Sequence, residues 1–278
     1  MQLVVGGRLV TWHDPVVMGI VNATPDSFHA ASRAATVADA VDACRRMTDE
    51  GATILDIGGQ STRPGADRVD VDEELRRVVP VIDAVRDALP EAIVSIDTFS
   101  ARVARAAIEA GAHIINDVSG GDLDDAMFDT VADLGVPYIL MHMQNTPDTM
   151  QDDPTYRDVV LDVARSLGER IDALRRRGVR DIIADPGFGF GKSTDHNYRL
   201  LTHLDLVKRQ VRAPILAGIS RKRMIQRVTG RDTAHALHGT TAAHMVALQQ
   251  GADILRVHDV APAVDAVRIF TATEAARP

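Results

Sequence analysis

The chain has 278 residues, of which 45% are hydrophobic and 25% are charged, and its formal net charge is −8. This composition is typical of a globular protein and excludes a disordered chain, and the acidic balance argues against a general nucleic-acid binder. A single cysteine, Cys44, excludes an internal disulfide and fits the reducing cytoplasm, and the lack of an apolar leader or of an 18-residue apolar run argues against secretion and membrane spanning.

Short β-rich runs alternate with longer amphipathic segments along the chain. An opening hairpin is predicted at "LVVGGRLV", and the β-rich runs that follow are residues 16–22, 52–59, 92–98, 113–119, 137–143, 181–187, 213–221 and 252–259. Helical segments such as "TVADAVDACRRMTDEG" separate them, and Cys44 is expected to be buried in that helix. Gly51, Gly111 and Gly251 indicate helix C-terminal caps. Eight strand–helix units predict an α/β fold, a single (β/α)8 TIM barrel of residues 1–278 with a short N-terminal β-hairpin. A doubly wound sheet is the alternative.

Each apolar run ends in polar or charged residues, where a barrel of this kind carries its chemistry. These residues are Asn22, Asp56, Asp97, Asn116, His142, Asp185, Ser220 to Lys222, Arg256 and His258. Polar residues also end strands simply because strand ends lie near solvent, and this simpler explanation covers some of them.

Alternation along the last two runs predicts an anion site, because every second strand residue faces the same side. Arg256 and His258 share one face of the last run, and Gly218, Ser220 and Lys222 share one face of the run before it. Cations and a histidine therefore converge on one mouth of an otherwise acidic protein.

The stretch "IIADPGFGFGKS" has some features of a nucleotide-binding P-loop. The pattern of glycine, four residues and Gly-Lys-Ser would need a glycine where Pro186 stands, and proline also removes a backbone N–H that a phosphate cradle uses. The sequence therefore argues against a P-loop at this position.

Asp185 is the feature of this stretch that needs another explanation. A residue before proline is held extended, so the acid ends its strand in a fixed direction. Together with Asp97 and Asn116, it can bind a ring that carries several N–H donors, and Phe188 and Phe190 offer ring faces. A metal site built from Asp97 and Asp185 is the alternative.

Two long segments follow the first two strands of the predicted barrel. They are "NATPDSFHAASRAAT" and "GGQSTRPGADRVDVDEE", and both are longer than ordinary connections between a strand and a helix. We expect them to be mobile active-site loops over the mouth. Ser61, Thr62 and Arg63 suit a phosphate, although ordinary surface loops are the simpler alternative.

Taken together, these motifs resemble those of the dihydropteroate synthase family, the folate-pathway enzymes that sulfonamides target. The motifs stand in the family's order, from about residue 16 to about residue 260: "MGIVNATPDSF", "DIGGQSTRPGA", "SIDT", "INDVSG", "MHM", "DPGFGFGK", "GISRK" and "RVHDV". The resemblance implies a cytoplasmic (β/α)8 barrel, usually a homodimer, that uses Mg²⁺. It also implies a reaction that joins 4-aminobenzoate to (7,8-dihydropterin-6-yl)methyl diphosphate and releases diphosphate and 7,8-dihydropteroate.

Matched motif by motif, the resemblance implies overlapping sets of site residues. The catalytic set would be Asp97, Asp185, Lys222 and Arg63. The pterin would contact Asp97, Asn116, Met141, Asp185, Phe190, Lys222 and Arg256. Diphosphate would contact Asn22, Arg63, Arg256 and His258, with the metal at Asn22. Aminobenzoate would border Thr62, Arg63, Pro64, Ser220 and Lys222.

The first loop departs from the family's usual "DSFSDGG". Ala30 replaces the loop acid, Ala31 and Ser32 replace two glycines, and Arg33 offers a different contact. The details of loop closure therefore differ from the family's pattern, whereas the residues of the barrel mouth do not.

The implied mechanism is a dissociative substitution without a covalent intermediate. The C–O bond at the pterin methylene breaks first, because the dihydropterin ring stabilises the resulting cation, and the neutral arylamine then attacks. Two alternatives remain. One is a pterin-dependent methyltransferase domain that serves a corrinoid partner, and the other is a non-catalytic pterin-binding paralogue.

Overall fold

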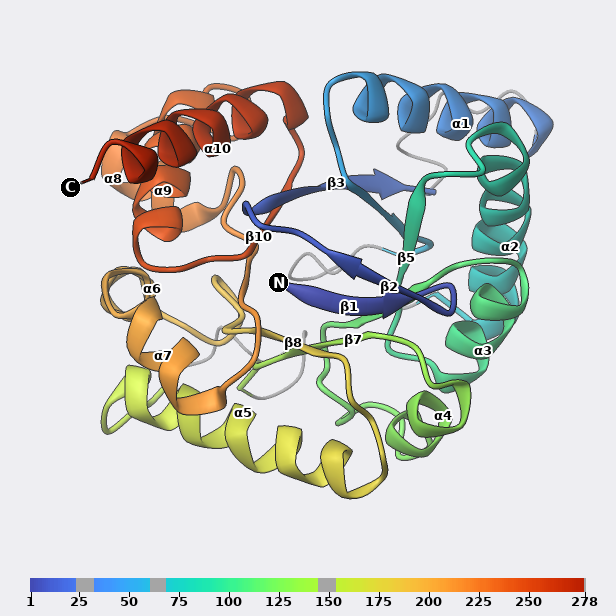
Figure 1. The fold of residues 1–278 in the computed structure, drawn as a ribbon, viewed down its shortest axis with the longest axis horizontal. Helices are drawn as coiled ribbons and strands as arrows, with labels where there is room; N and C mark the ends of the chain where they lie inside the picture. The colour runs from blue at the N-terminus through green and yellow to red at the C-terminus, as the bar shows by residue number, and fades with distance from the viewer. Residues whose placement is uncertain (24–32, 61–68, 145–153, 278) are drawn as a thin grey trace.

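A barrel of parallel strands forms the centre of the protein, in a computed structural model that describes residues 1–23, 33–60, 69–144 and 154–277 (Figure 1). The strands are β3 (Val16–Asn22), β4 (Ile54–Gly58), β5 (Ile93–Asp97), β6 (Ile114–Asp117), β7 (Tyr138–Met141), β8 (Ile182–Asp185), β9 (Leu216–Ala217) and β10 (Ile254–Val257). Their order is β8-β7-β6-β5-β4-β3-β10-β9. A parallel bridge between Ala184 and Ile215 joins the two edge strands and nearly closes the barrel. The barrel prediction is confirmed, and a doubly wound sheet is wrong because the edges of such a sheet do not meet.

The predicted opening hairpin is confirmed, and it covers one end of the barrel. Strands β1 (Gln2–Val5) and β2 (Arg8–Thr11) pair antiparallel. Leu3 and Val5 are buried against the barrel's interior residues, which include Val16 and Ile254 at the starts of their strands. The N-terminal end of the barrel is therefore filled with apolar side chains, and the C-terminal end is left for the site.

Helices surround the barrel and cover the outer faces of its strands (Figure 1). They are α1 (Arg33–Asp49), α2 (Val71–Ala88), α3 (Ala101–Glu109), α4 (Met127–Leu134), α5 (Val159–Arg176), α6 (Thr194–Thr202), α7 (Leu204–Val211), α8 (Arg223–Thr229), α9 (Leu237–Gln249) and α10 (Val260–Ala275). Side chains cap several of them. Asp70, for example, accepts from Asp72 N at 2.9 Å at the start of α2.

The predicted features of the helices are also confirmed. Gly51, Gly111 and Gly251 follow helix ends with positive φ angles of 101°, 104° and 91°. Cys44 is fully buried in α1, and burial raises the pKa of its thiol to about 12. Among the helices of the described residues, none combines the length and the apolar character that a membrane span needs.

Candidate active site

The register of the parallel strands brings strand-end residues to one level at the C-terminal mouth. Asn22 of β3 pairs with Gly58 of β4, Gly58 pairs with Asp97 of β5, and Asp97 pairs with Asn116 of β6. A side chain at residue 58 would approach the Cβ atom of Asp97 to 3.4 Å, so the glycine keeps space beside this acid. The predicted diphosphate and pterin residues therefore lie along one rim.

Arg256 of β10 bonds two acids, Asp56 of β4 and Asp97 of β5, inside the barrel. Its Nε donates to Asp56 Oδ2 at 2.6 Å, and its Nη2 donates to Asp97 Oδ2 at 2.5 Å. Asn116 Nδ2 also donates to Asp56 Oδ2, at 2.9 Å. The prediction that Arg256 faces the barrel interior is confirmed. The predicted pterin residues Asp97, Asn116 and Arg256 lie together there.

Asp56 belongs to the site as well, although the sequence predicted it only as a polar strand end and gave it no role. Its side chain is fully buried, and Oδ1 has no hydrogen-bond partner among the described residues. The signal was present, because Asp56 alternates with Ile54, whose side chain is in the barrel interior. Asp56 orients Arg256 and Asn116 toward the mouth.

Burial changes the proton affinity of both predicted pterin acids. Desolvation is the main cause that raises the pKa of Asp97 to about 7, and the cation of Arg256 opposes it. Burial likewise raises the pKa of Asp185, against the cation of Lys222 and a hydrogen bond from Gly187 N at 2.7 Å. Burial therefore shifts both carboxyl groups toward the protonated form relative to an exposed aspartate.

Lys222 faces Asp185 across a glycine. A Cβ atom at Gly218 would lie 3.8 Å from Asp185 Oδ2 and 3.9 Å from Lys222 Nζ, so the absence of a side chain keeps space between the acid and the cation. The ammonium lies 4.5 Å from the centroid of the Phe190 ring and donates to Phe188 O. Burial lowers the pKa of Lys222 to about 8.

An apolar wall adjoins these polar groups. Met141 and Phe190, both predicted to line a ring, pack in one cluster with Val118 and Met143. The expectation for Phe188 is wrong, because its side chain is fully buried in the core between strands and helices. Only Phe190 of the two phenylalanines contacts the wall.

Lys192, the lysine of the P-loop-like stretch, bonds groups within the protein. Its buried ammonium lies 3.0 Å from His142 Nδ1 and donates to Gly187 O at 2.9 Å and to Phe190 O at 3.0 Å. A Cβ atom at Gly187, where φ is +69°, would lie 1.9 Å from His142 O, so only glycine lets this loop pack against β7. These contacts support the prediction that the segment is not a P-loop.

The anion side of the mouth joins two predicted residues. Ser220 Oγ accepts from His258 N at 3.2 Å and lies 3.1 Å from His258 Nδ1. Ser220 is buried and His258 is exposed.

The predicted contacts Thr62, Arg63 and Pro64 lie outside the described residues, as do Ala30 to Ser32 and the side chain of Arg33. Their roles stay predictions.

A buried pair that was not predicted stands beside the second long segment. Gln60 Nε2 donates to Glu74 Oε2 at 2.9 Å, and both side chains are buried. Burial raises the pKa of Glu74. The pair joins the segment that follows β4 to the first turn of α2.

The alternative metal site has no structural support among the described residues. They contain no group of three His, Cys, Asp or Glu side chains that could hold a metal ion. Asp97 is bonded to Arg256, and the cation of Lys222 has the largest Coulombic influence on the pKa of Asp185. Each acid therefore has a cationic neighbour within the protein.

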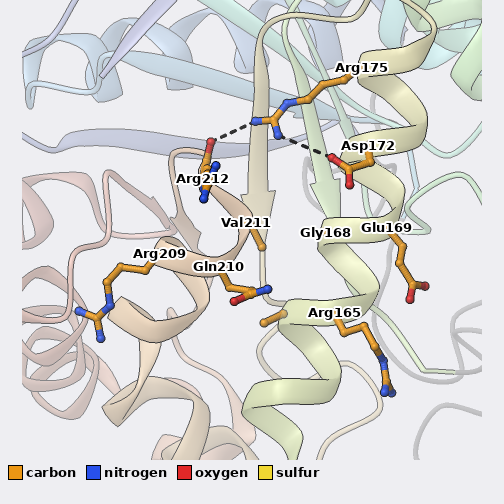
Figure 2. A pocket seen from close by; sticks show the side chains of 10 residues that line it. Arg165, Gly168, Glu169, Asp172, Arg175, Arg209, Gln210, Val211 and Arg212 are labelled. Atoms are coloured by element: carbon orange, nitrogen blue, oxygen red, sulfur yellow. Dashed lines mark hydrogen bonds and ion pairs between the residues drawn. The ribbon is translucent and has the colours of Figure 1, made fainter.

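A hollow of about 460 Å³ lies elsewhere, on the outer ring between α5 and α7 (Figure 2). Arg175 donates to Arg212 O at 3.1 Å and pairs with Asp172 at 3.9 Å inside it. Arg212 precedes β9, so this end of the hollow is near the N-terminal end of the barrel. The hollow is separate from the mouth described above.

Comparisons with known proteins identify the family of the chain. Residues 18–258 match the family described as pterin binding enzyme. The chain is 42% identical to the dihydropteroate synthase of Escherichia coli (strain K12), over 100% of this chain and 98% of that one. The dihydropteroate synthase of Xanthomonas albilineans, solved with 4-aminobenzoic acid, is 47% identical with a TM-score of 0.91, covering 100% of this chain and 99% of that one. The same enzyme was solved with 7,8-dihydropteroate, at 45% identity and a TM-score of 0.89, covering 100% of both chains. A Yersinia pestis dihydropteroate synthase in complex with a sulfonamide drug is 39% identical with a TM-score of 0.92, again over 100% of both chains.

Proposed function

The chain belongs to the pterin-binding enzyme family, and from this premise we propose how its barrel mouth performs the reaction of a dihydropteroate synthase. In that reaction 4-aminobenzoate joins (7,8-dihydropterin-6-yl)methyl diphosphate, and diphosphate and 7,8-dihydropteroate are released. The enzyme is a transferase of folate biosynthesis.

One observation supports the assignment of the pterin side most strongly: polar and apolar groups for a flat ring converge there. Asp97 and Asp185 end β5 and β8, Asn116 is the last residue but one of β6, and the wall of Met141 and Phe190 adjoins them. A carboxylate matches two adjacent N–H groups as it matches a guanidinium, and a pterin presents such a pair. We assign these residues, with Lys222 and Arg256, to pterin binding.

We place diphosphate beside the cationic residues at the same mouth. Arg256 is held by Asp56 and Asp97, and His258 lies against Ser220. Together with Arg63, they would stabilise the negative charge that develops on the departing diphosphate. The C–O bond then breaks before the arylamine attacks. The pterin cation is stabilised by its own ring electrons and by the nearby acids Asp97 and Asp185.

We propose aminobenzoate binding beside the cations, bordered by Thr62, Arg63, Pro64, Ser220 and Lys222. Ser220 and Lys222 are two residues apart in the segment that follows β9, and both are near the anion side. The arylamine attacks as a neutral nucleophile, so no general base from the protein is needed to generate an anion. Its proton leaves to solvent or to the released diphosphate.

Magnesium would be held by Asn22. Its amide oxygen is a hard ligand at the end of β3, at the level of Asp97, and Mg²⁺ commonly combines few protein ligands with substrate phosphates and water. Bound there, the ion would neutralise charge on the diphosphate. A magnesium titration followed by isothermal calorimetry, with diphosphate present, should show binding in the wild-type protein and at least tenfold weaker binding in Asn22→Ala.

A direct assay tests the function and separates it from the two alternatives. The protein is incubated with the pterin diphosphate, 4-aminobenzoate and Mg²⁺, and dihydropteroate is measured by liquid chromatography. We expect product formation that requires all three. A non-catalytic paralogue would bind the pterin and form none. A methyltransferase domain would bind a methylated pterin and form none, and either result would overturn the assignment.

We also propose a cytoplasmic homodimer. Two large hydrophobic side chains, Val228 on α8 and Ile269 on α10, are 64% and 60% exposed, and their helices gather on one side of the barrel. Covering such residues favours association. A single buried cysteine suits a reducing compartment. Light scattering should give twice the monomer mass of 30.0 kDa, and Val228→Glu should shift the protein toward monomer.

A further inference from the structure

Arg221, which stands between the site residues Ser220 and Lys222, has an unusual backbone conformation. Its φ is +56°, in the left-handed region that favours glycine. It is the third residue of a turn in which Lys222 N donates to Ile219 O at 3.3 Å. Turns with a positive φ at the third position usually carry glycine there. An arginine at this position must be held by other contacts.

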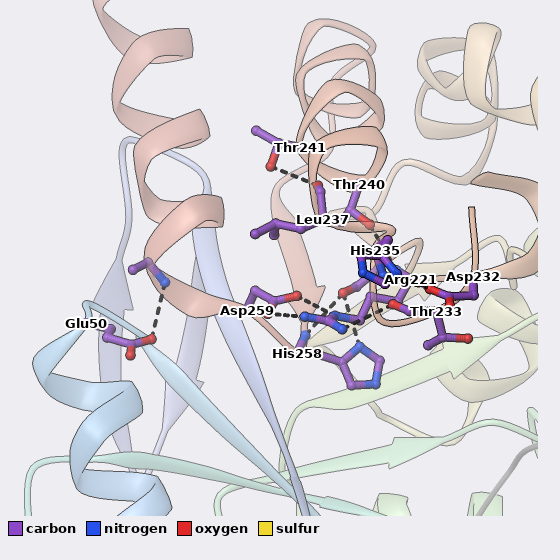
Figure 3. Close-up of polar contacts among 12 residues, drawn as sticks. Glu50, Arg221, Asp232, Thr233, His235, Leu237, Thr240, Thr241, His258 and Asp259 are labelled. Carbon is purple, nitrogen blue, oxygen red and sulfur yellow. Dashed lines mark hydrogen bonds and ion pairs between the residues drawn. The ribbon is translucent and has the colours of Figure 1, made fainter. Parts of the chain in front are cut away.

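The side chain of Arg221 provides these contacts (Figure 3). Its Nε and Nη2 donate to the two carboxylate oxygens of Asp259, each at 2.7 Å, and its Nη1 donates to Thr233 O at 3.1 Å. The backbone is bonded too, because N donates to Thr240 Oγ1 at 3.1 Å and O accepts from Gln226 Nε2 at 2.8 Å. A forked arginine–carboxylate pair fixes orientation as well as distance.

Asp259 pairs with Arg221 and does not cap its own helix. It is the N-cap residue of α10, where an aspartate usually accepts from a free helix N–H group, yet its side chain makes no capping bond. Ala261 N donates instead to Glu50 Oε2 at 3.3 Å, from the segment that follows α1 (Figure 3). One ion pair therefore accounts for both a left-handed arginine and an aspartate that does not cap its helix.

Each partner of the pair is next to a residue of the anion side. Ser220 precedes Arg221 and Lys222 follows it, while His258 precedes Asp259. The contact between Ser220 and His258 spans the same two segments. We propose that the Arg221–Asp259 pair is a positioning device that fixes Ser220, Lys222 and His258 relative to one another, and so completes the aminobenzoate side of the site. This inference rests on the proposed function.

Steady-state kinetics with each substrate varied in turn tests the proposal. Arg221→Ala and Asp259→Ala should each raise the KM for 4-aminobenzoate at least tenfold. The KM for the pterin diphosphate should rise by a clearly smaller factor, because that substrate loses the positioned Lys222 and His258 but keeps Asp97, Asn116 and Asp185 on other strands. The double variant should be no worse than the worse single variant, since both changes remove one interaction. Asp259→Asn keeps the side-chain shape and serves if Asp259→Ala does not fold.

A glycine variant separates the turn from the charge. Arg221→Gly also lacks the guanidinium, but glycine adopts a positive φ without help. The KM for aminobenzoate should therefore be at least threefold lower in Arg221→Gly than in Arg221→Ala. Arg177→Ala is the matched control, because Arg177 forms a 2.8 Å pair with Asp129 on the outer ring. Its two KM values should equal those of the wild type.

Several outcomes would overturn the proposal. Aminobenzoate KM values within threefold of wild type for Arg221→Ala and Asp259→Ala would show that the pair positions nothing. Equal losses for both substrates, or an equal effect of Arg177→Ala, would indicate a general loss of stability. Equal KM values for Arg221→Gly and Arg221→Ala would contradict the role of the turn. A wild-type protein that forms no dihydropteroate would refute the proposed function and this inference with it, whereas active wild type with unchanged variants refutes only the pair's role.

Discussion

Arg256 at the end of β10 donates to Asp97 at the end of β5 at 2.5 Å, across the interior of the barrel. The cation lowers the pKa of Asp97, but burial outweighs it and raises that pKa from 3.8 to about 7. In the free protein, the acid therefore takes up a proton over a range in which an exposed aspartate is fully ionised.

This shift predicts a pH dependence of stability. From about pH 4 to about pH 7 the folded protein retains a proton that the unfolded chain has released, so the free energy of unfolding falls as pH rises through this range. Asp97→Asn removes this contribution. Urea unfolding at pH 5 and pH 7.5 should show a smaller fall in the variant than in the wild type, and equal falls would contradict the raised pKa.

Asp185→Asn should nearly abolish turnover and leave the fold intact. The change removes charge-assisted hydrogen bonds to the pterin of about 1.5–3 kcal/mol each, so kcat/KM should fall at least about tenfold. Asp181→Asn, at the opposite end of the same β-rich run, is the matched control and should keep wild-type kinetics. A near-wild-type rate in folded Asp185→Asn would refute the pterin assignment.

Lys222→Arg should also be damaging although the charge is kept. The ammonium lies between the Phe190 ring and the backbone of Phe188, where a planar guanidinium has a different shape and hydrogen-bond geometry. Calorimetry should show weaker binding of both pterin and aminobenzoate. The same exchange at Lys208, which pairs with Asp253 at the N-terminal end of the barrel, should alter neither affinity. A change confined to the melting temperature of Lys222→Arg would mean that Lys222 is structural.

Lys192→Met should lower the free energy of unfolding by about 2 kcal/mol or more. The change leaves the buried carbonyls of Gly187 and Phe190 without their donor, and each unsatisfied group costs about 1–3 kcal/mol. Lys208→Met breaks a partly exposed pair and should cost about 1 kcal/mol or less. Chemical denaturation measures both. If Lys192→Met kept its stability and lost only phosphate binding, the result would support the rejected hypothesis of a P-loop.

Aminobenzoate and diphosphate should bind cooperatively. The sequence around Thr62, Arg63 and Pro64 is long and polar, so little apolar burial would offset the conformational entropy of fixing these residues around a ligand, whereas an ion pair between diphosphate and Arg63 would offset it. Calorimetry should show at least about tenfold tighter aminobenzoate binding with magnesium and diphosphate present, a coupling of about 1.4 kcal/mol. By reciprocity, aminobenzoate should tighten diphosphate equally. Equal affinities with and without diphosphate would mean that the aminobenzoate site is preformed.

The sequence alone determined the barrel and the direction of several side chains. Side chains repeat every two residues in a strand and every 3.6 residues in a helix, because the backbone fixes these periods. The eight β-rich runs and the inward direction of Arg256 could therefore be predicted from neighbouring residues in the sequence. Polar residues at the ends of those runs marked the mouth, because parallel strands all end on the same side. The motifs then supplied the chemistry.

Tertiary structure decided which of these residues are partners. Asp56 bonds Arg256 and Asn116, which are 200 and 60 positions away, and no local pattern gives such a pairing. Phe188 turns into the outer core because the residues flanking it, Gly187 and Gly189, have positive φ angles, which ends the alternation of the strand. The raised pKa of Asp97 depends on burial by distant segments. Periodicity is a local property of the chain, whereas desolvation and partner choice arise only when strands far apart in sequence meet at one mouth.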